Sequence, residues 1–346
     1  MKRTKKIIRN LIIFILLIIL TFSIILKDQD IGQIFNVLAG VKKEFILIAI
    51  ICMCIYITLD AINIGRALKA LNEKSTFLKN IKYALIGFFF SAITPAASGG
   101  QPMQIYYMYK DNISVANSTL TFLINLSCVQ IVTISLALFS LFFNYKYMNK
   151  ALAWCFVIGV GLNLSALILL LISILSKRMT KGLINIVVKI LKFFKFKNIE
   201  EKQQKLEKEL SKYQSSTEYI KNNKRVVIKT LLTTYVQYII FYNITYWVYR
   251  SFGLSKHNIF EITTMQSLLY ATVSGIPSPG AVGVSEGAFI AIYSTIFLEN
   301  MLKGAMLLTR GVNFYLFVIL SSIVSSISAV KERKQEKNVE SIEINQ

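Results

Sequence analysis

The chain has 346 residues, of which 54% are hydrophobic and 16% charged, and its formal net charge is +21. A soluble domain normally carries about a quarter charged residues, so this composition excludes an ordinary water-soluble globular protein. Apolar residues gather in blocks long enough to cross a hydrocarbon core of about 30 Å, which takes roughly 20 helical residues. The sequence therefore predicts an all-α integral membrane protein with a single membrane domain over residues 1–346.

Six apolar blocks have the length of complete transmembrane helices, and charged or Asn-rich loops separate them. The first block follows five basic residues, as a signal peptide would, but it is longer than the usual apolar region of one. No small-residue cleavage motif follows it, so we interpret it as a membrane helix. The six predicted spans are Ile7–Leu26, Phe45–Asn63, Val115–Phe143, Ala151–Leu175, Val226–Val248 and Gly304–Val330.

Two further apolar regions, Tyr83–Tyr109 and Ile262–Leu298, are each interrupted in the middle by proline and glycine. Proline cannot continue a helix and glycine adopts conformations that other residues avoid, so each interruption predicts a turn. Irregular backbone at membrane depth survives only where protein or a water-filled cavity covers it. We therefore expect both turns to line a cavity. They contain all four prolines of the chain, Pro95, Pro102, Pro277 and Pro279.

The distribution of basic residues favours a topology in which both interrupted regions are re-entrant hairpins. In that topology one side of the membrane holds 30 Lys and Arg and the other side eight, with Arg310 inside a span. By the positive-inside rule the basic side is cytoplasmic, so both termini are predicted to be cytoplasmic in a multi-pass cell-membrane protein. The predicted parts are a first half at 1–175, a basic linker at 176–225, a second half at 226–330 and a polar tail at 331–346.

This topology makes the two halves inverted, because the first hairpin enters from the cytoplasmic side and the second from outside. The turns also share a weak pattern, since Gly99 follows Pro95 by four positions and Gly283 follows Pro279 by four. Paired interrupted segments in corresponding positions of two halves are the sequence sign of a transporter site near the bilayer midplane.

The linker contains the most basic part of the chain. Within it, Gly182–Lys197 mixes lysines with Ile, Leu and Phe at near-helical spacing. This pattern predicts a helix in the cytoplasmic headgroup layer that binds anionic lipid, with a regulatory or substrate-feeding role as the alternative. The net positive charge has the same explanation and requires no nucleic-acid partner. A homo-oligomer stays open, because the sequence does not fix the oligomeric state.

The four cysteines lie in apolar blocks and the one histidine, His257, lies in a polar loop, so we predict no metal site and no cofactor. Charges within the membrane are costly and are functional candidates by default. Asp60 could instead pair with Arg66 or reach water, and Glu261 could simply complement a helix dipole. Glu286 could cap its own helix or bind a cationic headgroup. Arg310 could neutralise Glu286 or hold a lipid phosphate.

Amides at the two turns form a further predicted anion site, because half-helix N-termini present unpaired N–H groups. The side chains of Gln101 and Gln104 could add neutral hydrogen bonds, and Lys110 lies near the end of the first hairpin. We predict no catalytic residues. The full set of predicted substrate-binding residues is Gly99, Gly100, Gln101, Gln104, Lys110, Pro279, Gly280, Gly283, Glu286 and Arg310.

Three segments, 94–110, 277–287 and 308–315, resemble the signatures of the lysylphosphatidylglycerol synthase transmembrane, or flippase-like, family. This family is the membrane half of the multiple peptide resistance factor, and the resemblance extends over roughly residues 7–330. Many members have Gly-Glu where this chain has Gly100-Gln101, and the second signature often reads Pro-Gly-Gly where this chain has Pro279-Gly280-Ala281.

The resemblance implies translocation of an anionic or aminoacylated phospholipid such as lysyl-phosphatidylglycerol, with a role in resistance to cationic antimicrobial peptides. In the family the lysyl transfer belongs to a separate soluble domain, and the sixteen residues after Val330 are too few for one. The alternative function is an integral membrane enzyme of lipid metabolism, a phosphatidylglycerol lysyltransferase by similarity. The sequence offers isolated carboxylates without a His or Asp-rich motif for such chemistry. We therefore favour transport.

Overall fold

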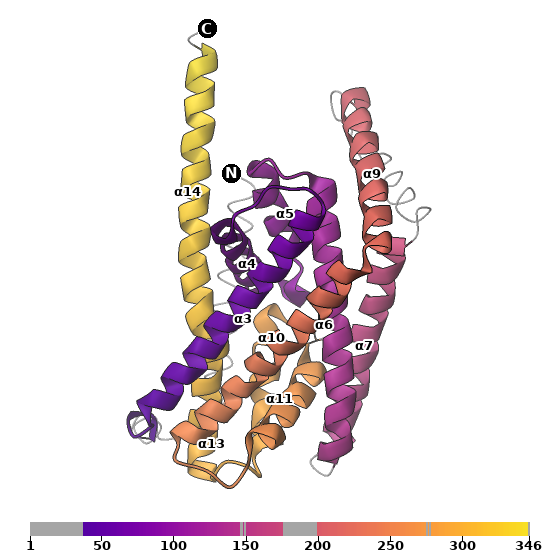
Figure 1. The fold of residues 1–346 in the computed structure, drawn as a ribbon. Coiled ribbons are helices and arrows are strands. Elements are labelled where there is room, and N and C mark those ends of the chain that lie inside the picture. Colours follow the sequence, from indigo (N-terminus) through magenta and orange to yellow (C-terminus); the bar gives the residue numbers. More distant parts are fainter. Residues whose placement is uncertain are drawn as a thin grey trace.

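The structure, a computed structural model, describes residues 37–145, 148, 150–175, 199–274, 276 and 278–344. The predicted span Ile7–Leu26 and the predicted amphipathic segment Gly182–Lys197 lie outside the described residues. Every regular element in the described part is helical, which agrees with the predicted fold class (Figure 1).

Within the part of the chain that the structure describes, four helices are long and apolar enough to cross a membrane. The first three are α3 (Lys43–Ala70), α6 (Val115–Asn144) and α7 (Lys150–Leu175), and the fourth is the stretch Glu299–Glu332. α7 exposes many large apolar side chains, including Trp154, which is 69% exposed. Contiguous apolar surface of this kind is unfavourable in water but favourable in lipid. The helical membrane protein predicted from composition is thus confirmed.

Helix α10 (Lys224–Ser251) packs along α3 in the antiparallel direction. At one end the amide of Lys42 donates to the carbonyl of Ser251 at 2.8 Å. Further along, Asn63 Nδ2 donates to Thr234 Oγ1 at 3.2 Å. These contacts bring the start of α3 to the end of α10, and the two helices pack together along their length. Figure 1 shows them crossing the near face of the bundle.

The first interrupted region folds as a helical hairpin of α4 (Phe77–Ala92), the 3-10 turn η1 (Pro95–Ala97) and α5 (Gly100–Lys110). Its two ends lie together, because Asp111 accepts hydrogen bonds from Lys82 Nζ at 2.6 Å and from the hydroxyl of Tyr83. The ends lie at the same end of the bundle as Glu73 and the linker helix, which we name the α9 end.

The second interrupted region repeats this arrangement from the opposite end of the bundle, which we name the far end. It consists of α11 (Ile259–Val273), the 3-10 turn η3 (Pro279–Ala281) and α12 (Val284–Tyr293). The hydroxyl of Tyr293 donates to the carbonyl of Ile262 at 3.3 Å, so the end of α12 lies beside the start of α11. The start of α11 in turn follows the end of α10.

The last predicted span is not one regular helix. It consists of α13 (Glu299–Arg310), a π-helical turn η4 (Gly311–Tyr315) and α14 (Leu316–Ile344). The sequence predicted one continuous apolar helix here and gave no sign of the π turn. Hydropathy is the same for an α-helix and for a helix that contains a π turn, so it cannot distinguish them. Single π turns inside helices occur frequently at functional sites.

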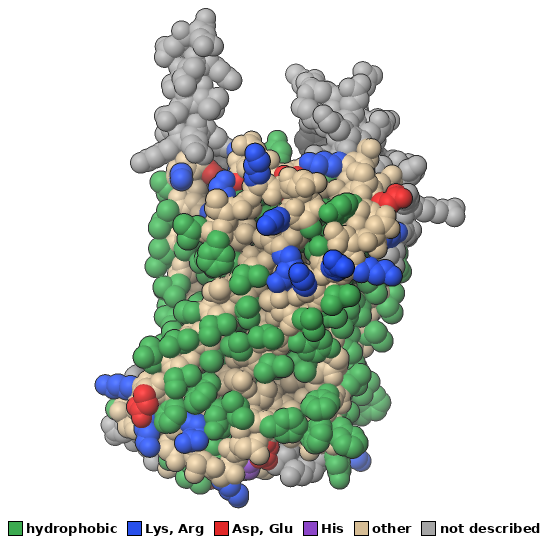
Figure 2. Space-filling model, viewed as in Figure 1, with side chains coloured by type: hydrophobic (Ala, Val, Ile, Leu, Met, Phe, Trp, Pro, Cys, Tyr) green, Lys and Arg blue, Asp and Glu red, His purple; other side chains and the backbone are tan. Residues whose placement is uncertain are grey.

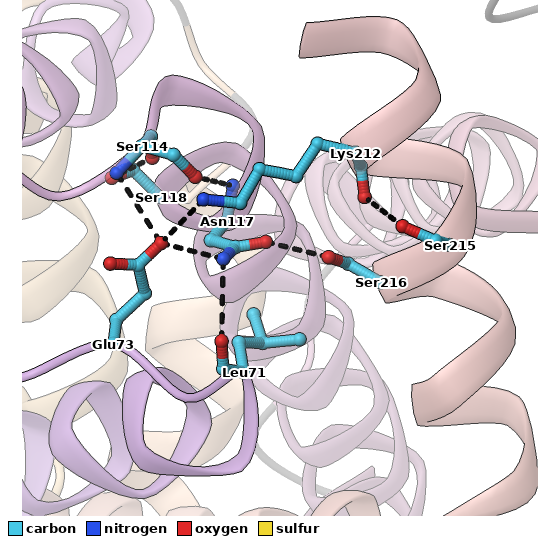
Figure 3. A network of polar contacts seen from close by, with 8 residues as sticks. All are labelled: Leu71, Glu73, Ser114, Asn117, Ser118, Lys212, Ser215 and Ser216. Atoms are coloured by element: carbon cyan, nitrogen blue, oxygen red, sulfur yellow. Dashed lines mark hydrogen bonds and ion pairs between the residues drawn. The ribbon is translucent and has the colours of Figure 1, made fainter. Parts of the chain in front are cut away.

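The linker helix α9 (Ile199–Asn222) is held to the α9 end of the bundle by a polar network around Glu73 (Figure 3). One carboxylate oxygen of Glu73 accepts hydrogen bonds from Lys212 Nζ at 3.1 Å and Asn117 Nδ2 at 2.6 Å. Ser216 donates to Asn117 Oδ1 at 2.7 Å. Partial burial alone would raise the pKa of Glu73, but the bonds from Lys212 and Asn117 outweigh it and lower that pKa.

Lys and Arg side chains gather at the two ends of the molecule, and apolar side chains cover much of the surface between them (Figure 2). This distribution matches a bilayer, whose hydrocarbon core excludes charge and whose headgroup layers accept it.

Candidate functional site

The second and third residues of the two proline turns have the same backbone shape, and the chains diverge after them, because Ser98 is helical and Val282 extended. In η1, Ala96 has φ 51° and ψ 30°, and in η3 the corresponding Gly280 has φ 60° and ψ 16°. The next residues, Ala97 and Ala281, have φ values of 54° and 53°. Two successive left-handed residues are uncommon outside glycine, so their recurrence after Pro95 and Pro279 marks the turns as structural equivalents.

The tips of the two hairpins meet, because η1 lies against η3. Each hairpin begins and ends at its own end of the bundle, so the tips meet between the two ends. The residues of η1 are exposed, whereas those of η3 are buried or partly buried. Phe88 of α4 contributes to this junction through Phe314 of the π turn, with ring centroids 6.2 Å apart. The junction therefore joins both halves of the chain.

Glu286 lies in the first turn of α12, beside this junction, and its side chain has no exposed surface. Its Oε1 accepts from Arg310 Nε at 2.8 Å and from the hydroxyl of Tyr315 at 3.1 Å. Its Oε2 accepts from the amide of Gly283 at 2.7 Å. Glu286 thus caps its own helix and also pairs with Arg310, which were two of the alternatives open from the sequence.

Arg310 fixes the second turn from the other side. Its Nη2 donates to the carbonyl of Gly280 at 3.0 Å, and its guanidinium lies 4.2 Å from the ring centroid of Phe314. The hydrogen bonds to Glu286 and Gly280 use two of its five N–H donors. The side chain is 11% exposed.

The π turn explains how one short segment supplies both partners of Glu286. In a π turn hydrogen bonds close between residues five apart, so residues 310 and 315 come to lie on the same face. In a regular α-helix positions five apart point in different directions. The insertion of this turn therefore places Arg310 and Tyr315 together on one carboxylate oxygen.

Three buried polar atoms close in sequence to this pair have no hydrogen-bond partner among the described residues. They are Ser278 Oγ, Thr309 Oγ1 and Asn313 Oδ1. Buried polar groups are normally paired, and an unpaired one calls for an explanation such as a ligand or water. The site therefore has unused hydrogen-bonding capacity beside a charged pair.

The glycines of the first hairpin serve close packing. A side chain at Gly100 would meet the hydroxyl of Ser91 at 2.1 Å, and one at Gly87 would meet the amide of Gln104 at 2.2 Å. The Gly99 amide donates to Thr94 Oγ1 at 2.9 Å, so this amide closes the turn.

The other predicted residues of the first hairpin lie apart from the ion pair. Gln104 donates to the carbonyl of Tyr83 at 3.0 Å and so links α5 to α4. Lys110 is exposed at the C-terminal end of α5, at the α9 end of the bundle, with its ammonium 5.8 Å from the ring centroid of Tyr106. Gln101 is partly exposed in the first turn of α5, next to the junction.

The structure also places the other charged candidates. No ion pair joins Asp60 to Arg66 in the described residues; Arg66 donates to Asn63 Oδ1 at 2.7 Å instead. Glu261 lies in the first turn of α11 and its Oε2 is 2.9 Å from His257 Nδ1, which fits the helix-dipole interpretation. Among the described residues no group of three His, Cys, Asp or Glu is placed to hold a metal.

Reasoning from the sequence missed Tyr315 and Phe314 as parts of the site. Both lie in the third signature segment, five and four positions after Arg310. An α-helical pattern places Phe314 on the same face as Arg310 but Tyr315 on another face, and the π turn brings Tyr315 to the pair.

Comparison with known proteins agrees with a membrane assignment. The chain is 24% identical over 301 residues to a UPF0104 membrane protein of Pyrococcus horikoshii, covering 84% of this chain and 88% of that protein. It is 19% identical over 330 residues to a UPF0104 membrane protein of Archaeoglobus fulgidus, covering 92% and 97%. Residues 7–321 match the family described as Lysylphosphatidylglycerol synthase TM region. The chain therefore belongs to the family of lysylphosphatidylglycerol synthase transmembrane regions.

Proposed function

We propose that the protein is a lipid flippase that moves an anionic or aminoacylated phospholipid between the leaflets of the cell membrane. The observation that carries this proposal is the contact between two equivalent proline turns next to the buried pair of Glu286 and Arg310. Paired broken helices in two halves are the arrangement that transporters use to build a site at mid-depth.

In the proposed membrane arrangement six helices cross the bilayer and the two hairpins are re-entrant. The α9 end, with its basic linker, faces the cytoplasm, and so do both termini. The first hairpin then enters from the cytoplasmic side and the second from outside, which makes the halves inverted. A site where the tips meet is reachable in turn from either side, as alternating access requires.

The chemistry of the pair favours a ligand that carries a phosphate. The Arg310 guanidinium is held by Glu286 and Gly280 but keeps donors beyond those two contacts. A planar guanidinium grips phosphate oxygens in pairs, which an ammonium does not do. The neighbouring polar atoms without partners, Ser278 Oγ and Asn313 Oδ1, are suited to a headgroup with hydroxyl or amino groups.

The basic linker has a supporting role in this proposal. The lysines of Gly182–Lys197 would bind anionic lipid of the cytoplasmic leaflet and concentrate substrate there.

A translocation assay in proteoliposomes tests the proposal. Fluorescent phospholipids with phosphatidylglycerol, lysyl-phosphatidylglycerol, phosphatidylethanolamine and phosphatidylcholine headgroups are placed in the membrane, and their appearance in the other leaflet is followed by chemical quenching. We expect acceleration for at least one of the first two headgroups. Lysine transfer to phosphatidylglycerol without any translocation would support the enzyme alternative instead.

A further inference from the structure

A groove at the far end of the bundle lies between α6, α10 and α11, away from the ion pair. Its volume is about 270 Å³. Apolar side chains form most of its surface, namely Leu136, Phe139, Ile239, Ile259 and Phe260. Four of these five, all except Leu136, are at least 40% exposed, so the groove opens on the outer surface of the bundle.

The position of this groove along the bundle matches the boundary of a bilayer. α6 belongs to the helices that can cross a membrane, and the groove lies near its last turns. Large aromatic side chains are exposed around it: Phe142 is 78% exposed and Tyr145 71%. Exposed Tyr and Trp residues gather at the level of lipid headgroups, and Tyr145 is one of them. A groove at this depth faces the region where polar and apolar parts of a lipid meet.

The groove also has hydrogen-bond donors that the protein does not use. Ser267 is 2% exposed and its hydroxyl has no partner among the described residues. Asn243 accepts a hydrogen bond from Thr263 through Oδ1, and its Nδ2 makes no hydrogen bond within the described part of the chain. Both residues line the groove. Asn243 is partly exposed, so its Nδ2 can reach water, whereas the Ser267 hydroxyl is buried. A buried donor without an acceptor costs free energy, so an acceptor supplied to Ser267 by a ligand would be favourable.

From these observations we propose that the groove binds the ester-linked glycerol region and upper acyl chains of a membrane phospholipid. The apolar wall accepts the chains, and Ser267 and Asn243 donate to the ester carbonyl oxygens. An ester carbonyl is an acceptor without a donor of its own, which suits a site that offers two donors. The groove is therefore a lipid-entry site on the outer side, and this role rests on the proposed flippase function.

Binding of matched ester and ether lipids tests the site directly. The probes are phosphatidylglycerol with two ester-linked chains and its analogue with two ether-linked chains of equal length, which lacks the carbonyl acceptors. Native mass spectrometry measures their binding to the purified protein. Because one hydrogen bond contributes about 1 kcal/mol, we expect the wild type to bind the ester lipid about five-fold more tightly.

In Ser267→Ala the ratio of the affinities for the ester and the ether lipid should fall toward one. The affinity for the ether lipid should stay unchanged. Ser325→Ala is the matched control, because Ser325 is also buried and has an unpartnered hydroxyl but lies on α14, outside the groove. Equal affinity of the wild type for both lipids, or a preference that persists in Ser267→Ala, would overturn the proposal.

A second variant tests whether lipid binding in the groove is needed for translocation. Ile239→Trp fills the groove from an exposed position, and Ile319→Trp on α14 is its control at another exposed position. We expect Ile239→Trp to lose binding of both probes and to slow translocation. Translocation at the wild-type rate after binding is lost would overturn the entry role. Specific binding by a wild type that translocates no lipid would contradict the flippase function and leave the groove as a lipid site.

Discussion

The hydroxyl of Tyr315 lies 3.1 Å from Oε1 of Glu286, a carboxylate whose side chain has no exposed surface. The same oxygen accepts the hydrogen of Arg310 Nε at 2.8 Å. Breaking a buried ion pair by removing one partner is costly, because the other charge stays buried without compensation. The π turn that brings these two donors together therefore determines both the stability of the second hairpin and the position of Arg310.

Removing the Tyr315 hydroxyl should destabilise the protein without removing either charge. A hydrogen bond to a charged group contributes about 1.5–3 kcal/mol, so Tyr315→Phe should lower the free energy of unfolding by about that amount. The measurement is thermal unfolding in detergent. Tyr219→Phe is the control, since Tyr219 is exposed on α9 and its hydroxyl only accepts from Asn223. Equal midpoints for Tyr315→Phe and the wild type would show that the hydroxyl contributes nothing.

A side chain at position 280 should disrupt the second turn, chiefly because it would meet Phe314. Gly280 has φ +60°, and a Cβ there would lie 2.2 Å from Phe314 Cζ. Gly280→Ala should therefore destabilise the protein by about 1–3 kcal/mol. Gly287→Ala is the matched control, because that glycine lies in α12 with open space around its Cα, and alanine there should stabilise by about 0.5–1 kcal/mol. A neutral Gly280→Ala would refute the described turn.

The attachment of α9 should depend on pH through Glu73. The pKa of Glu73 is lowered in the folded protein. A lowered pKa contributes stability that is fully present above the ordinary Glu value of about 4.3 and is lost as pH falls through the folded value. Hydrogen exchange of residues 211–222 should therefore accelerate as the pH falls below about 4.3. In Glu73→Gln the exchange of these residues should be faster than in the wild type at neutral pH, and it should change less as the pH falls. Identical pH profiles of exchange in the variant and the wild type would contradict the role of Glu73.

Cysteine labelling tests the proposed membrane arrangement. In a background without Cys52, Cys54, Cys128 and Cys155, Tyr109→Cys should react from the cytoplasmic side and Lys256→Cys from outside. Both positions are exposed, the first at the end of α5 and the second in the α10–α11 loop. Intact cells and inverted vesicles with an impermeant reagent give the comparison. Reaction of both cysteines from the same side would remove the inverted arrangement.

Much of the fold followed from composition and from the four prolines. Long apolar blocks predict helices because a bilayer leaves the backbone no other partner than itself. The interruptions after Thr94 and Ser278 were predicted because proline and glycine break helices, and the structure places a 3-10 turn at each.

The site was predicted in part. Glu286 and Arg310 stood out because charge within an apolar segment is costly, and they do form a pair. The π turn could not be predicted, since no hydropathy pattern separates it from an α-helix. Tyr315 was missed for this reason. Gln104 was predicted as a ligand from its position, but its bond to the Tyr83 carbonyl depends on how closely α4 and α5 pack, which Gly87 and Gly100 determine.

Translocation by the wild type and by Arg310→Lys in proteoliposomes tests the central claim most directly. Lysine keeps the positive charge beside Glu286. Its ammonium lacks the planar fork of the guanidinium, so it cannot bind Glu286, the Gly280 carbonyl and a phosphate at the same time. With Gly287→Ala as a folded control, we expect the wild type to move phosphatidylglycerol or its lysyl ester and Arg310→Lys to be slower by about tenfold. A wild type that moves no headgroup faster than protein-free liposomes, or an Arg310→Lys variant with the wild-type rate, would contradict the account.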